Sequence, residues 1–119
     1  MSVIYFTSDL MATSKISGAA TSTGIDLKIA PNANVCQVLL NEDAEGLLVD
    51  LNQQAAIACE LIRLARSLDE DLPIIAHGPH VQEGTLQSAL DAGATHVVTN
   101  GQLHRDTAAV LAACQKPAG

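Results

Sequence analysis

The chain has 119 residues, a length that suits one domain with a buried core. Its formal net charge of −7 argues against nucleic-acid and anionic-membrane partners, because binding to either requires basic patches. Three widely spaced cysteines, no leader-like N-terminus and no apolar run of about 18–20 residues favour a cytoplasmic protein.

Apolar runs alternate with helical patterns along the chain and predict five strand–helix units. The predicted strands are 3–6, 25–29, 47–49, 73–76 and 95–99. The predicted helices run from Asp9 to Gly24, around 35–39, from about 55 to 67 and over 81–92. One last helix follows Asn100-Gly101 and carries Leu103, Val110 and Leu111. Asp9 is a good N-cap for the first helix, and Leu10, Ile16 and Ala20 mark its apolar face. The tail 115–119 is expected to fray.

Alternating strands and helices with short connections imply a parallel sheet that is covered by helices on both faces. We therefore expect an α/β three-layer sandwich. Segment 25–29 alternates apolar with charged residues, which indicates an edge strand. Five units with one such edge favour the flavodoxin-like strand order 2-1-3-4-5.

Polar residues follow the predicted strands at the edge of the sheet where ligands bind in such folds. The expected crevice is lined by Ser8, Asp9, Asp50, Gly78, His80 and Asn100. His77 and His80 are predicted to share the loop after the fourth strand and to face Asp50. Two simpler interpretations stay open: Asp9 caps a helix, and Asp50 binds neighbouring loop amides.

Four marks occur in a fixed order: Ser8-Asp9 after the first strand, Asp50-Leu51-Asn52 after the third, Leu72-Pro73-Ile74-Ile75 at the fourth, and Ala89-Leu90-Asp91-Ala92-Gly93-Ala94 before the fifth. Together they resemble the response-regulator receiver domain, of which chemotaxis response regulators consist. The similarity covers about 3–114, so we expect one receiver-like domain over 1–119. The resemblance implies a signalling module that accepts a phosphoryl group, not an enzyme that turns over a substrate.

The same resemblance assigns roles to individual positions. It implies that Asp50 is the phosphoacceptor and that Asp9, Asp50 and the carbonyl of Asn52 hold Mg²⁺. Three positions depart from the family's pattern. Ser8 stands in place of an acid, Gly78 in place of a hydroxyl residue and Asn100 in place of a lysine, so the phosphorylation site is expected to be degenerate.

Three hypotheses follow. The leading one is a divergent receiver-like protein that regulates a signalling kinase or an output protein by contact, through the face built from 81–92, 95–99 and the last helix; a homodimer stays open. The second is a working phosphorelay receiver that is phosphorylated on Asp50 with Mg²⁺. The third is a small-ligand-binding protein or an enzyme that uses the crevice.

Overall fold

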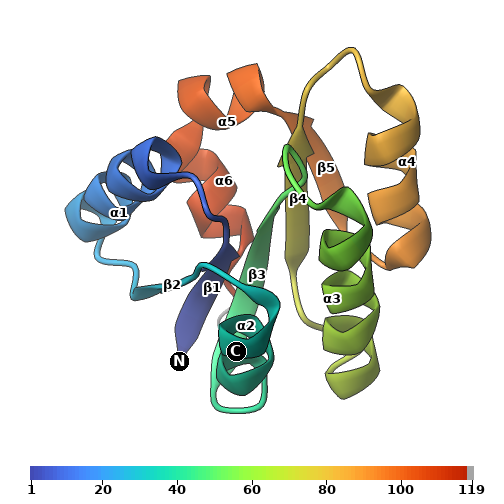
Figure 1. Ribbon diagram of the computed structural model, residues 1–119. Helices are drawn as coiled ribbons and strands as arrows, with labels where there is room; N and C mark the ends of the chain where they lie inside the picture. Colours follow the sequence, from blue (N-terminus) through green and yellow to red (C-terminus); the bar gives the residue numbers. More distant parts are fainter. Residues whose placement is uncertain (118–119) are drawn as a thin grey trace.

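The computed structural model describes residues 1–117, in which strands and helices alternate (Figure 1). The strands are β1 (Ser2–Phe6), β2 (Leu27–Ala30), β3 (Ala44–Asp50), β4 (Ile74–Gly78) and β5 (His96–Thr99). The helices are α1 (Leu10–Thr23), α2 (Ala33–Leu40), α3 (Ala55–Leu68), α4 (Glu83–Ala92), α5 (Asn100–Arg105) and α6 (Thr107–Ala113).

The strands form one parallel sheet of order β2-β1-β3-β4-β5. This confirms the predicted flavodoxin-like α/β fold, with β2 at one edge. Helices α1, α5 and α6 cover one face of the sheet, and α2, α3 and α4 cover the other (Figure 1). The carboxyl ends of all five strands therefore lie at the same edge of the sheet.

Each strand contributes to two cores because successive side chains point to opposite faces. In β3, Leu47 and Val49 pack under α2 and α3, whereas Leu48 packs under α1 and α6. The two aromatic residues are divided in the same way, with Phe6 in the first core and Tyr5 in the second. This alternation decides which polar residues can meet at the ends of the strands.

The predicted ends of α1 are confirmed. Asp9 Oδ1 accepts hydrogen bonds from the backbone N–H groups of Met11 (2.9 Å) and Ala12 (3.3 Å). Gly24 ends the helix at φ 74°, the left-handed conformation that glycine adopts at low cost. The apolar face was predicted partly wrongly, because Leu10 is 83% exposed. It lies six residues before the buried Ile16, about 120° around a helix of 3.6 residues per turn.

Several element boundaries differ from the predictions, and at β3 and the last helix tertiary contacts and side-chain bonds override local signals. Strand β3 begins at Ala44, three residues early, and its Gly46 lies directly against the end of α6. The expected last helix is broken at Asp106, between α5 and α6. After the break, the Thr107 hydroxyl donates to the carbonyl of Leu103 (2.7 Å), a local side-chain bond that competes with helix continuation.

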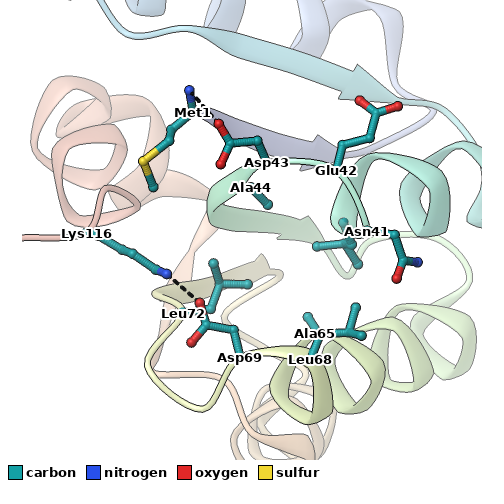
Figure 2. Close-up of a pocket in the computed structure, with 11 residues that line it drawn as sticks. Met1, Asn41, Glu42, Asp43, Ala44, Ala65, Leu68, Asp69, Leu72 and Lys116 are labelled. Atoms are coloured by element: carbon teal, nitrogen blue, oxygen red, sulfur yellow. Dashed lines mark ion pairs between the residues drawn. The ribbon is translucent and has the colours of Figure 1, made fainter.

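The end of the described chain contacts the amino end of the sheet. Gln115 Nε2 donates to Glu45 Oε1 (3.0 Å), and Lys116 forms an ion pair with Asp69 (Figure 2). Residues 118 and 119 of the expected frayed tail lie outside the described residues. None of the helices within 1–117 is long and apolar enough to cross a membrane.

Candidate functional site

Asp50 is the last residue of β3, and its carboxylate is held by neutral donors. Oδ2 accepts a hydrogen bond from the hydroxyl of Thr7 (2.7 Å). Oδ1 accepts two more, from the backbone N–H (2.8 Å) and the side-chain amide (2.7 Å) of Asn52. The residue is only 5% exposed. None of the hydrogen bonds to this buried carboxylate comes from a cationic side chain.

Thr7 is a member of the site that the sequence prediction missed. It follows β1, and its side chain is on the same face of the sheet as Tyr5 and Asp50. Counting alternate residues from Tyr5 would have found it. Asp9 instead is exposed and caps α1, while the hydroxyl of Ser8 donates to Gln53 Oε1 (2.8 Å).

A pair of amides joins the ends of β3 and β5. Asn52 Nδ2 donates to Asn100 Oδ1 (2.9 Å), and Asn100 Nδ2 donates to Asn52 Oδ1 (2.7 Å). Asn100 is the first residue of α5, directly after β5. The structure therefore brings together Asp50 and Asn100 of the predicted crevice through the side chain of Asn52, which had been expected to act through its carbonyl.

His77 is not in a loop, as had been predicted, but in β4, where it is 3% exposed. The prediction was wrong because parallel pairing continues to the end of the sheet: His77 pairs with Asp50 and Gly78 with Thr99. Its Nδ1 lies 2.9 Å from Asn100 Oδ1, and its Nε2 lies 2.9 Å from the hydroxyl of Tyr5. His80 is separate and exposed in the loop that follows.

Burial shapes the ionisation of this histidine and this tyrosine. Burial lowers the pKa of His77 below its usual 6.5, against the opposing effects of the Asn100 hydrogen bond and the Asp50 charge. Burial, together with the negative charge of Asp50, raises the pKa of Tyr5 far above its usual 10. Both side chains are therefore neutral at pH 7.

Gly78 lies where the resemblance calls for a hydroxyl residue, and the space around it is apolar. A Cβ at this position would lie 3.3 Å from Leu51 Cβ and 3.4 Å from Leu86 Cδ2. The first distance is tighter than an ordinary van der Waals contact, and the second is at its lower limit. A hydroxyl side chain here would require Leu51 or Leu86 to move.

The two carboxylates proposed for Mg²⁺ both accept hydrogen bonds from protein groups. Mg²⁺ requires oxygen ligands in near-octahedral arrangement. Asp50 faces O–H and N–H donors, and Asp9 Oδ1 is occupied by the start of α1. Within 1–117, no cluster of three or more His, Cys, Asp or Glu side chains is placed to hold a metal ion.

Three cavities lie away from the crevice. One of about 290 Å³ is at the amino end of the sheet, between the ends of α2 and α3 (Figure 2). Another of about 390 Å³ lies between α3 and α4, and a third of about 260 Å³ lies beside β5 and α6. None of the three is lined by a residue of the expected crevice.

No protein-family model and no curated protein matches the sequence. Solved structures do match. NtrX from Brucella abortus superposes with a TM-score of 0.82 at 16% identity, over 96% of this chain and 27% of that one. Its isolated receiver domain gives 0.79 at 17% identity, over 92% and 93% of the two chains.

The chemotaxis protein CheY4 from Vibrio cholerae gives a TM-score of 0.79 at 13% identity, over 95% of this chain and 97% of that one. The chain thus has the fold of a response-regulator receiver domain, as the resemblance implied. It spans about a quarter of the full NtrX chain and nearly all of the single-domain structures.

Proposed function

We propose that this protein is a receiver-like signalling protein that regulates a protein partner by contact, with a phosphorylation site that no longer works as a switch. The observation that carries the proposal is the environment of Asp50. Its carboxylate is nearly buried and is bound by Thr7 and Asn52, and the groups expected to stabilise a phosphoryl group are replaced.

Phosphoryl transfer depends mostly on positioning and on stabilising charge at the transferred oxygens. Asn100 supplies a neutral amide in place of a lysine, and that amide is already paired with Asn52. Neutral hydrogen bonds are about half as strong as charged ones. Gly78 supplies no hydroxyl to contact the phosphoryl group, and a Cβ there would lie tightly against Leu51. Asp50 would thus be a poor acceptor, with Mg²⁺ bound weakly at most.

The proposed contact surface is the face formed by α4, β5 and the two helices α5 and α6 into which the expected last helix is divided. β5 is an edge strand of the sheet, and an apolar groove lined by Ile75, Val98 and Val110 runs beside it. Leu90 on α4 is 38% exposed. An edge strand beside apolar side chains suits a protein partner such as a signalling kinase, an output protein or a second copy of this chain.

The phosphorelay alternative keeps one supporting observation, which is that Asp50 ends β3 as a phosphoacceptor would. Amide chemical shifts distinguish the two functions. The protein is titrated with Mg²⁺ and then with beryllofluoride, with Asp50→Asn as the control. We expect no Mg²⁺-dependent change around Asp50 beyond that seen in the control. A change that Asp50→Asn abolishes would establish the phosphorelay function instead.

A binding experiment tests the contact function. Once a partner is identified by affinity capture, its dissociation constant is measured for the wild type, Asp50→Asn, Leu90→Arg and Val38→Arg. Val38 is an exposed aliphatic residue on α2, which packs on the far side of α3 from α4, and serves as the matched control. We expect only Leu90→Arg to weaken binding. Loss of binding in Asp50→Asn would contradict the proposal.

A further inference from the structure

A continuous series of hydrogen bonds runs from Asp50 through the exposed Asn52–Asn100 amide pair at the crevice to the buried Tyr5 inside the sheet. It begins at Asp50 Oδ1, which accepts from Asn52, and continues through the Asn52–Asn100 amide pair. From Asn100 Oδ1 it passes to His77 Nδ1, and from His77 Nε2 to the hydroxyl of Tyr5. The side chains come from β1, β3, β4 and the segments after β3 and β5, so only the folded sheet assembles them.

The donor in each of these bonds is fixed by the carboxylate at one end. An ionised Asp50 can only accept, so the Asn52 NH₂ group must face it. The same NH₂ group donates to Asn100 Oδ1, which makes that oxygen an acceptor for His77 as well. His77 therefore carries its proton on Nδ1, and its bare Nε2 accepts from Tyr5 O–H.

The far end of the series reaches the layer formed by α1 and α6. Tyr5 is fully buried and belongs to the core that contains Ile16 of α1 and Leu111 of α6. Its ring also packs against the ring of His77, with centroids 5.7 Å apart at 56°. Within the described residues, every buried side-chain N or O atom has a hydrogen-bond partner. Turning the Asn100 amide over would leave Nδ1 of the buried His77 facing an NH₂ group instead of an acceptor, so the members are expected to rearrange together.

We propose that this series, which we call the Asp50–Tyr5 relay (Asp50, Asn52, Asn100, His77 and Tyr5), couples the crevice to the α1–α6 layer, with His77 as its positioning residue. The inference rests on the proposed function, because it supplies a route by which a change at the crevice reaches a surface layer. Gly78, at the position where the resemblance calls for a hydroxyl residue, has no side chain and cannot supply such a route. The relay leads to the layer opposite α4.

Nitrogen NMR of the histidine rings tests the relay without a partner or a phosphate analogue. In the wild type we expect His77 to be neutral, with a protonated Nδ1 and a bare Nε2. Asn52→Ala should release Asn100, mix the two His77 tautomers and shift the methyl signals of Ile16 and Leu111. Gln53→Ala, which removes the neighbouring amide outside the relay, should change neither readout.

Tyr5→Phe perturbs the relay from its buried end, because it removes only the Tyr5 hydroxyl. We expect it to shift the side-chain NH₂ signals of Asn52 and Asn100, whereas Ser88→Ala on α4 should leave them in place. A wild-type His77 protonated on Nε2 would overturn the relay. The relay would also be overturned if the His77 nitrogen signals of Asn52→Ala were the same as those of the Gln53→Ala control. The same holds if the side-chain NH₂ signals of Asn52 and Asn100 did not shift in Tyr5→Phe. None of these results depends on whether beryllofluoride binds or a partner is found, so the two proposals fail separately.

Discussion

Asp50 and His77 lie directly opposite one another in the parallel pairing of β3 and β4, and both are almost completely buried. An acid and an imidazole at adjacent strand ends would ordinarily form an ion pair. Here they do not, because His77 is neutral and directs its two nitrogens to Tyr5 and Asn100. Asp50 is satisfied by Thr7 and Asn52 instead.

The neutral state of His77 predicts a dependence of stability on pH. Its pKa is below 6.5 in the folded protein, so below about pH 6.5 the unfolded chain binds the proton more readily. The free energy of unfolding should therefore fall as the pH is lowered from about 7 to 5.5, a range above the usual titration of carboxylates. Urea unfolding at several pH values measures it.

Two histidine variants provide the control for this measurement. His77→Gln should remove the fall between about pH 7 and 5.5, because no buried imidazole remains to be protonated. His80→Gln changes an exposed side chain in the next loop and should keep the wild-type slope. If both variants kept the slope, the protonation of His77 would not be its cause.

The hydroxyl of Thr7 should contribute measurably to stability through its bond to Asp50. Thr7→Val keeps the shape of the side chain but leaves one buried oxygen of Asp50 without its donor, which should cost about 1–3 kcal/mol. Thr7→Ser keeps the hydroxyl and should lose less. In an Asp50→Leu background, Thr7→Val should cost clearly less than in the wild type. Additive effects in that cycle would contradict the contact.

Gly46 is the position where a single methyl group should be most damaging. A Cβ there would lie 1.4 Å from the backbone carbonyl oxygen of Cys114, so α6 would have to move off the sheet. We expect Gly46→Ala to destabilise the protein by about 3 kcal/mol or more, at the upper end of overpacking effects. The free energy of unfolding in urea measures it.

Gly18 offers the matched control, since it lies in α1 with no atom within 4 Å of an added Cβ. Gly18→Ala should stabilise the protein by about 0.5–1 kcal/mol, because alanine is the better helix former. Equal stability of the two variants would mean that the end of α6 does not pack on β3.

Arg66 on α3 should stabilise the fold by hydrogen bonding to the turn before β5. Its guanidinium donates to the carbonyl oxygens of Gly93, Asp69, Glu70 and Leu72. Arg66→Ala should cost about 2 kcal/mol, the range for hydrogen bonds from a charged group. Arg66→Lys should recover little of this, because an ammonium lacks the planar fork of donors.

The control for Arg66 is on the same helix. Arg63 is exposed and makes none of these contacts, so Arg63→Ala should change the free energy of unfolding by no more than about 0.5 kcal/mol. Full recovery by Arg66→Lys would show that charge alone, without the fork geometry, holds the turn.

Local chemistry decided much of the fold, and this part was predictable. Asp9 and Gly24 end α1 because a side-chain cap and a left-handed residue act on their immediate neighbours. The apolar runs became strands, and their alternation with helices was enough to predict the sheet order. The end of β4 and the break at Asp106 were not predictable in this way, since strand pairing and packing on the sheet set them.

The candidate site, like the fold, has a part that the sequence predicted and a part that it did not. The sequence by itself determined that Asp50, Asn52 and Asn100 meet at one edge of a parallel sheet, because the carboxyl ends of its strands share that edge. Only the tertiary structure decided that the Thr7 hydroxyl bonds to Asp50 and that His77 joins Asn100. The physical reason is register: which side chains meet across neighbouring strands depends on pairings between distant segments, and no local pattern specifies them.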